Sequence, residues 1–335
     1  MSVKFGLGWS INHMQAEFPL AQLPARSAET VRVAHDSGFH LVKCAHHWLA
    51  HILQPVPMIG WCAAAGPGMD FMTSILVLPQ QNPVDIAGQA ATLDLITGGH
   101  FILGVGLGYR EKEFRAAGVR KAERVARLEE AIPLMRKLWT GKNVTHKGRF
   151  YDVDDAGSSV TPLQPGGVPI FLGAQSAGAV RRAGRLGDGW IIPGFYTKDL
   201  LRQHLGLFEQ GAREAGKPSA GARVLMRSVV IGKTHDEALE QARDWLGSQW
   251  RGQVYARWGM QEPGTANLDL SFDEIVRERA IVGTADQVIE GIRSYVQEFK
   301  ISHFIPLFRR DDTSHREHLD QIKFYGREVL AHVAP

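Results

Sequence analysis

Eight short apolar segments, separated by helical or turn-rich stretches, constrain the fold more than any other feature of this sequence. Short apolar segments bounded by turn residues are typical of buried strands. Strands that alternate with helices predict a parallel sheet, and eight of them suit a closed (β/α)₈ barrel, which has no exposed strand edge. The sequence therefore predicts an α/β fold of the TIM-barrel type, with strands at Lys4–Ser10, His40–Cys44, Phe71–Leu78, Phe101–Val105, Ile170–Gly173, Trp190–Ile192, Val224–Ile231 and His303–Phe308.

Helical patterns connect these predicted strands. Apolar residues recur on one face of Ala122–Trp139 and of Ala285–Phe299, as in amphipathic helices. Pro133 lies inside the first of them and is expected to kink or split that helix, because proline has no N–H to donate. Three helix starts carry a Ser or Thr followed three residues later by Glu or Gln, a spacing that caps free backbone N–H groups. They are Thr234–Glu237, Thr284–Gln287 and Ser314–Glu317.

We expect residues 1–335 to form one barrel domain, because such barrels often reach this length as a single unit. Two stretches depart from the alternation of strands and helices. Residues 144–155 are expected to form a hairpin attached to the barrel. Residues 247–279 carry aromatic and glycine residues without a clear period, and an insertion of that length in a compact domain is typical of a lid.

Charge and cysteine content narrow the classes of function. The 38 Lys and Arg residues nearly balance the 35 Asp and Glu residues, and no basic block is interleaved with aromatic residues, so we expect no nucleic-acid partner. Cys44 and Cys62 form neither a CxxC motif nor a disulfide framework, which favours a reducing compartment. The chain lacks the patterns of a signal peptide and of a membrane span, so we expect a cytoplasmic protein without membrane contact.

The segment CAHHWLAH, residues 44–51, places His46, His47 and His51 after a predicted strand. In a (β/α)₈ barrel the carboxyl ends of the strands form the active site, where a histidine can exchange protons near neutral pH. A metal site is disfavoured, because no HxH motif follows the first predicted strand and no carboxylate follows His46 or His47. We therefore predict that His46 handles protons and that no metal is bound.

Two further segments could bind a flat anionic ligand. Gly104, Gly106 and Gly108 follow a predicted strand and would let the backbone approach a ring or a phosphate, although they could equally be an ordinary strand exit. Gln175 and Ser176 lie where a helix begins, and the free N–H groups there favour an anion. An ordinary serine cap is an equally good interpretation of Ser176.

Four segments, taken in order, resemble the bacterial luciferase-like flavin monooxygenases, a (β/α)₈ superfamily that also contains deazaflavin-dependent oxidoreductases. They are SGFHLVKCAHHW, LVLPQQNPVDIAGQAATLDLITGGHFILGVGLGYREKEFRAAG, VPIFLGAQSAGAVRRAGRLGDGWI and IVGTADQVIEGIRSY. The resemblance runs over nearly the whole chain, and its middle segments are long and specific.

The resemblance implies a role for single residues. His46 matches the catalytic histidine beside the flavin ring, although Ala45 stands where the family often has Glu. A strained cis peptide bond would fall among Met72 to Ser74. The implied cofactor-binding residues are Thr73, Ser74, Asn82, Gly106, Leu107, Tyr109, Gly173, Ala174, Gln175, Ser176 and Ala177. Asn82 is also expected to cap the helix that begins with Pro83.

The resemblance also implies residues for the lid and the substrate. Arg277 and Arg279 are candidates to close over the cofactor phosphate, although a solvated helix face explains them equally well. Trp9 and Trp48 suggest an aromatic substrate pocket, although such residues are also ordinary packing material in a barrel.

The function that we expect from the resemblance is a two-component monooxygenase. A separate flavin reductase would supply reduced FMN, and the barrel would use oxygen to oxygenate a small organic substrate. The alternative within the fold is a deazaflavin-dependent dehydrogenase or reductase, against which we count the absence of an acid among Leu107, Gly108 and Tyr109. A metal-dependent hydrolase and a flavin-binding protein without turnover are the alternatives from other classes. A homodimer is usual for the family.

Overall fold

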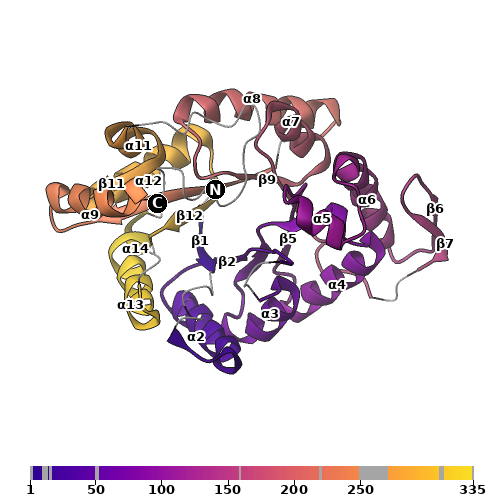
Figure 1. Ribbon diagram of the computed structural model, residues 1–335, viewed down its shortest axis with the longest axis horizontal. Helices are drawn as coiled ribbons and strands as arrows, with labels where there is room; N and C mark the ends of the chain where they lie inside the picture. Colours follow the sequence, from indigo (N-terminus) through magenta and orange to yellow (C-terminus); the bar gives the residue numbers. More distant parts are fainter. Residues whose placement is uncertain are drawn as a thin grey trace.

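The computed structural model describes residues 3–9, 14, 17–49, 53–157, 160–218, 221–248, 271–308 and 313–333. Ten strands form one parallel sheet, and eight strand positions in it close into a ring (Figure 1). The ring runs through β1 (Lys4–Trp9), β2 (Leu41–Cys44), β3 (Asp70–Thr73), β5 (Phe101–Gly106), β8 (Ile170–Gly173), β9 (Gly189–Ile192), β10 (Ala222–Ile231) and β12 (His303–Leu307). The pairing of β9 with β10 and of β12 with β1 completes the barrel, which confirms the predicted (β/α)₈ fold.

The third predicted strand differs from the expectation. Residues 71–78 were expected to form one strand, but the structure has β3, then β4 (Leu76–Val77), which pairs with β5. Ser74 and Ile75 separate the two, and the peptide bond between them is cis. This bond lies one position beyond the range Met72 to Ser74 in which it was expected, so that placement was wrong by one residue.

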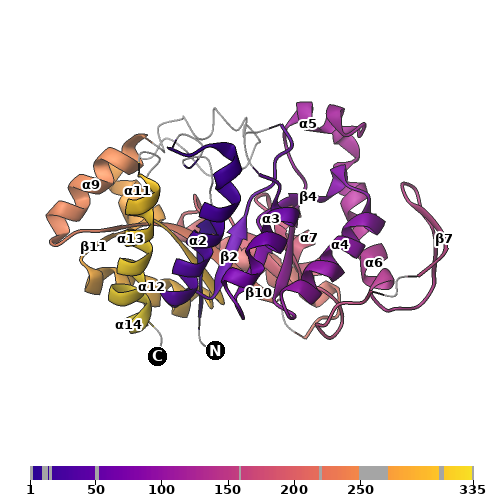
Figure 2. The ribbon, with the colours of Figure 1, turned by 90° about the horizontal axis from the view of Figure 1, so that it is seen from below.

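The described helices cover the outside of the ring, except that α5 lies at the end of the barrel where the strands have their carboxyl ends (Figures 1 and 2). They are α2 (Leu23–Asp36), α3 (Pro55–Cys62), α4 (Pro83–Ile96), α5 (Glu111–Ala116), α6 (Arg124–Leu138), α7 (Ala177–Leu186), α8 (Lys198–Glu214), α9 (His235–Ser248), α11 (Phe272–Arg279), α12 (Ala285–Phe299), α13 (His315–Tyr325) and α14 (Ala331–Val333). None of the helices formed by the described residues is both long and apolar enough to cross a membrane.

Helix α6 continues through Pro133, so the expected split does not occur. Burial of Leu128 and Ile132 before the proline and of Met135 after it holds both halves of the helix against the barrel, which offsets the lost hydrogen bond. The capping boxes that begin at Thr284 and Ser314 are confirmed.

The helix start at Thr234 is capped only in part. The Thr234 hydroxyl accepts the N–H of Glu237, but the Glu237 carboxylate accepts the N–H of Lys233 instead of that of Thr234. A further capping box, formed by Ser271 and Glu274, was not predicted.

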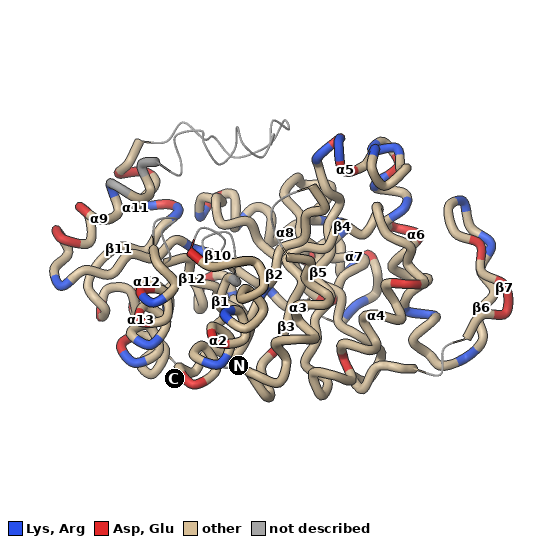
Figure 3. The backbone as a smooth tube through the Cα atoms, turned by 60° about the horizontal axis from the view of Figure 1, so that its bottom comes forward, with Lys and Arg blue, Asp and Glu red and all other residues tan. Residues whose placement is uncertain are grey.

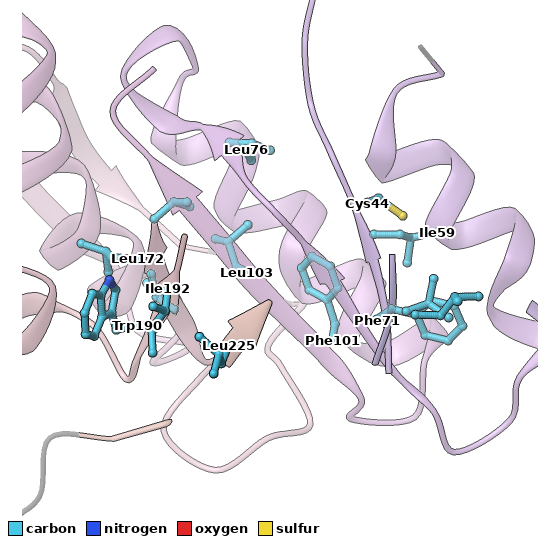
Figure 4. Packing of buried hydrophobic residues seen from close by; sticks show 14 of the residues in the cluster. Cys44, Ile59, Phe71, Leu76, Phe101, Leu103, Leu172, Trp190, Ile192 and Leu225 are labelled. Atoms are coloured by element: carbon cyan, nitrogen blue, oxygen red, sulfur yellow. The ribbon is translucent and has the colours of Figure 1, made fainter. Parts of the chain in front are cut away.

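Two apolar layers form the core of the barrel, and a third, smaller cluster packs α9 and α11 on β11. Inside the ring, Leu41, Met72, Ile102, Phe171, Ile191, Val224 and Ile305 fill the barrel. A larger layer lies between strands and helices, and Figure 4 shows some of its members, including Phe71, Phe101 and Trp190. Because side chains alternate along a strand, Leu41 faces the interior while Val42 and Cys44 face the helices.

Two features lie outside the ring. Strands β6 (Val144–Lys147) and β7 (Asp152–Ala156) pair antiparallel, and the Glu130 carboxylate on α6 accepts the N–H groups of Arg149, Phe150 and Tyr151 at the turn between them. The carboxyl-terminal half of β10 pairs with β11 (Ala280–Gly283), a strand that the sequence did not predict.

Candidate active site

A cavity of about 440 Å³ opens at the carboxyl ends of the barrel strands. Its walls come from the loop after β2, the β3–β4 break, the exit of β5, the starts of α5, α6 and α7, the end of β9 and the middle of β10. The lining residues are Ala45, His46, His47, Ser74, Ile75, Val77, Gly106, Leu107, Gly108, Tyr109, Glu113, Lys121, Arg124, Gly173, Ala174, Gln175, Ser176, Ala179, Ile191, Pro193 and Met226. A larger groove between α3 and α4 lies outside the barrel and offers Asp85 as its one ionisable group, so we assign the chemistry to the cavity.

His46 is 5% exposed and lies on the wall formed by the loop after β2. Its Nδ1 accepts the backbone N–H of Val77 at 3.4 Å. The pKa of His46 is lowered to about 4, mainly by burial and in part by the neighbouring His47, while Glu113 opposes the change. At neutral pH the ring is therefore uncharged, and because Nδ1 is an acceptor the proton lies on Nε2.

Glu113 forms a buried ion-pair group beside His46. Its carboxylate accepts from Arg110 Nη1 at 2.8 Å and lies 3.2 Å from His47 Nδ1. Burial lowers the pKa of His47, whereas the Glu113 carboxylate acts in the opposite direction. The ring of Tyr109 meets His47 edge to face, with 6.1 Å between the ring centroids.

One wall of the cavity is flat because glycines form it. A Cβ atom on Gly106 would lie 2.5 Å from Ile75 Cδ1, and one on Gly173 would lie 2.8 Å from Ile75 Cγ2. These two positions therefore exclude any larger residue while Ile75 keeps its place. The wall offers backbone and one aliphatic side chain to a planar ligand.

Two cationic side chains line the cavity, and we call the part that they line its positive end. Lys121 and Arg124 line it, and Figure 3 shows Lys and Arg residues around α5 and the beginning of α6. Helix α7 begins at the same place, and Ser176, its N-cap residue, makes no side-chain capping bond. The Tyr196 hydroxyl donates to the carbonyl of Gln175 at 2.5 Å and fixes the turn before the helix. This arrangement fits an anion bound to helix N–H groups and two cations.

Nine predicted site residues line the cavity: His46, Ser74, Gly106, Leu107, Tyr109, Gly173, Ala174, Gln175 and Ser176. Three other predicted cofactor-binding residues do not. The Thr73 hydroxyl is buried and donates to the Gly104 carbonyl at 2.8 Å. Asn82 caps α4 by accepting the N–H of Val84, as expected, and Ala177 is the first residue of α7.

The predicted lid and substrate residues also lie apart from the cavity lining. Arg279 is fully buried, and Arg277 is exposed and bonds to Glu278. Trp48 lies outside the lining, with its ring 6.2 Å from that of His46 between centroids. The side chain of Trp9, His51 and residues 249–270 of the predicted lid lie outside the described residues.

Sequence reasoning missed Glu113, Lys121 and Arg124. The sequence signal that could have indicated Glu113 is its spacing of three residues from Arg110, at the start of a short helix. Within the described part of the chain, no three His, Cys, Asp or Glu side chains form a group that could hold a metal ion. The absence of a metal stays a prediction.

Comparisons with known proteins give a consistent pattern of similarity. A model of the luciferase-like monooxygenase family matches residues 6–300. The chain is 29% identical over 330 residues to a protein of Nakamurella multipartita named F420-dependent glucose-6-phosphate dehydrogenase, with 92% of each chain covered. It is 30% identical to the protein of the same name from Microbacterium testaceum, covering 89% of this chain and 90% of the relative. Among solved structures, the monooxygenase RslO1 from Streptomyces bottropensis superposes with a TM-score of 0.81 at 21% identity, covering 98% of this chain and 99% of the other.

Proposed function

Because the chain belongs to the luciferase-like monooxygenase family of oxidoreductases, we propose that it binds the deazaflavin coenzyme F420 and interconverts a small alcohol and its carbonyl compound. One observation carries this proposal: relatives that are 29% and 30% identical along about nine-tenths of both chains are named F420-dependent dehydrogenases. The deazaflavin alternative is thus better supported than the FMN monooxygenase that the sequence led us to expect.

The two-component FMN monooxygenase has weaker support. The monooxygenase structure is 21% identical to this chain, and that likeness concerns the fold alone. The separate flavin reductase belongs to this second candidate and is not part of the proposal. The homodimer and the cytoplasmic location stay predictions.

Glu113 supplies the acid whose absence counted against a deazaflavin. Leu107, Gly108 and Tyr109 include no acid, but Glu113 follows one helical turn later and lines the same cavity. Its contacts with His47 and Arg110 hold the carboxylate next to the histidine pair. An acid is therefore available at the proposed site.

The cavity fits a planar ring with an anionic tail. Gly106, Gly173 and Ile75 form the flat wall, and Lys121, Arg124 and the start of α7 supply the positive end. When bound, the coenzyme would supply or accept the hydride, while the protein provides orientation and proton control. A ring against the glycine wall would have its tail at Ser176.

His46 would polarise the substrate oxygen. Its neutral ring carries the proton on Nε2, since Nδ1 already accepts the Val77 N–H. A neutral imidazole N–H is a hydrogen-bond donor, and in a low-dielectric cavity such a bond is stronger than in water. The residue would therefore hold a carbonyl or hydroxyl oxygen at the reacting end of the cavity.

A binding comparison tests the proposal. Purified protein is titrated with F420 and, without oxygen, with reduced FMN, and coenzyme fluorescence or absorbance gives each dissociation constant. We expect F420 to bind at least about tenfold more tightly, a difference of about 1.4 kcal/mol. Tighter binding of reduced FMN together with oxygen consumption would overturn the proposal in favour of the monooxygenase.

A pair of variants links binding to the cavity. Arg124→Met should weaken F420 binding, because Arg124 lies at the positive end. Arg115→Met is the matched control, since Arg115 is exposed and does not line the cavity. Equal effects of the two substitutions would place the coenzyme tail elsewhere.

A further inference from the structure

Lys43 extends into the barrel from β2, three residues before His46. Along this strand Leu41 belongs to the interior cluster, and Lys43, two residues further, faces the same side. Its strand neighbours are Gly8 on β1 and Met72 on β3. A Cβ atom on Gly8 would lie 3.4 Å from Lys43 Cε, so the lysine stem passes directly over that glycine.

The lysine stem lies at the same height along the barrel axis as the floor of the cavity. Ile75 and Met226 pack on the interior cluster and also line the cavity, so the top of the cluster is the bottom of the cavity. Leu307 also packs on the interior cluster. A Cβ atom built on Gly8 would lie 3.7 Å from Leu307 Cδ2, so Leu307 and Lys43 both approach the same glycine. Lys43 is not among the lining residues of the cavity, but its stem lies at the level of this floor, on the β1–β2 side of the barrel.

Among the residues that the structure describes, no anion compensates this ammonium group. Within the described residues the Lys43 side chain takes part in no ion pair and no hydrogen bond, whereas Lys4 pairs with Asp70 at 2.6 Å and Arg223 with Glu209 at 2.7 Å. Burial lowers the pKa of Lys43, because the charged form loses hydration inside the barrel. A bound anion would restore the lost interaction energy.

The other cations of the cavity occupy a different wall. Lys121 and Arg124 follow β5 along the chain and Ser176 follows β8, and the sheet order places β5 two positions and β8 three positions away from β2 in a ring of eight. Those two cations suit the coenzyme tail. Lys43 is therefore available to bind the substrate, the second ligand of the reaction.

We propose that Lys43 binds an anionic group, a carboxylate or a phosphate, of the substrate. The inference rests on the proposed function, because it assigns the coenzyme to a different wall of the cavity. It defines the substrate as a small alcohol or carbonyl compound that carries an acidic group at a distance from the reacting carbon.

Anion binding to the full-length chain tests this assignment. The protein with F420 bound is titrated calorimetrically with inorganic phosphate and with acetate. The two arms distinguish a phosphate site from a carboxylate site. We expect either phosphate or acetate to bind. Lys43→Met should weaken that binding at least about tenfold, because it removes one charge-assisted hydrogen bond. Lys43→Arg should retain most of it, because the charge is kept.

Two controls show whether a loss of anion binding is specific to Lys43. Lys147→Met removes an exposed lysine from β6 and should leave anion binding unchanged. Thermal unfolding checks that Lys43→Met is folded, and Lys43→Gln replaces it if it is not. Anion binding that is equal in the wild type and the folded Lys43 variant, or no binding of either anion, would overturn the proposal.

The same experiment distinguishes the two proposals. If F420 does not bind, the proposed coenzyme is wrong, and the anion titration is repeated on the chain without coenzyme in a Lys121→Met, Arg124→Met background. Binding that then depends on Lys43 supports the substrate site independently of F420. Binding that does not depend on Lys43 overturns it.

Discussion

Burial sets the protonation of the histidines that face the cavity. It lowers the pKa of His46 to about 4 and also lowers that of His47, so both rings are mainly neutral at physiological pH. The two rings differ in their partners, since His46 accepts a backbone N–H while His47 faces the Glu113 carboxylate. The His46 ring can therefore donate a hydrogen bond into the cavity, whereas the His47 ring is held in position by Glu113.

Replacing His46 by Asn should lower turnover by about a hundredfold or more, the usual contribution of a positioned proton donor. F420 binding should change little, because the flat wall and the positive end are intact. Steady-state kinetics and a coenzyme titration measure the two effects. Unchanged turnover would remove His46 from the catalytic role.

Replacing Glu113 by Gln should lower the pKa of His47 further. Burial already lowers this pKa, and the Glu113 carboxylate is the main group that opposes it. The substitution removes that charge while keeping the shape of the side chain. An NMR titration of the histidine rings measures the shift, with His146, which faces Glu130, as the internal control. A rise in the His47 pKa would contradict this account.

The sequence predicted the parts of the site that depend on backbone position. His46, Gln175 and Ser176 follow strands, so a barrel places them at one end whatever their neighbours are. Glu113, Lys121 and Arg124 belong to the segment around α5, whose position depends on packing that the sequence does not encode locally. Thr73 and Arg279 were predicted from their positions along the chain alone. Both side chains are buried and do not line the cavity.

At the scale of elements, the glycine wall depends on the exits of β5 and β8. Gly106→Ala should weaken coenzyme binding, because a Cβ there would lie 2.5 Å from Ile75 Cδ1 and push this side chain into the cavity. The coenzyme titration measures the loss. Gly206→Ala on α8 is the matched control, because its Cβ meets no atom within 4 Å.

This control has its own expected result. Gly206 lies inside a helix, so alanine should raise the free energy of unfolding by about 0.5–1 kcal/mol and leave coenzyme binding unchanged. Urea denaturation measures the change. A similar loss of coenzyme binding in both variants would show that the effect of Gly106→Ala is not local.

Elements with strong periodicity were the ones that the sequence predicted best. Helix α12 spans Ala285–Phe299 as expected, because its apolar residues and its capping box agree. Strand β11, which pairs with the carboxyl-terminal half of β10, was missed because it follows α11 directly, with no turn residue between them. The break between β3 and β4 was missed because Thr73 and Ser74 interrupt the apolar residues without a Gly or Pro that would indicate a turn.

At the scale of the whole molecule, buried histidines predict how stability depends on pH. The folded pKa is about 4 for both His46 and His303, below the ordinary value of 6.5, and burial is the main cause in each case. As pH falls below 6.5 the unfolded chain therefore binds protons first, so stability is full above that pH and declines towards pH 4. Each group contributes up to about 3 kcal/mol to this decline.

Urea denaturation between pH 7 and pH 4 measures the decline. His303→Gln should make it shallower, because one of the two contributions is removed. An equally steep decline in this variant would show that the buried histidines do not cause it.

Closure of the ring has a consequence for self-association. A strand edge with free N–H and C=O groups is a template for pairing with another molecule, and the ring offers none. In the described residues such edges are confined to β4, β11 and the β6–β7 pair, all of which are five residues or shorter. Amyloid-like stacking of the folded protein is therefore disfavoured, and aggregation should require the barrel to open first.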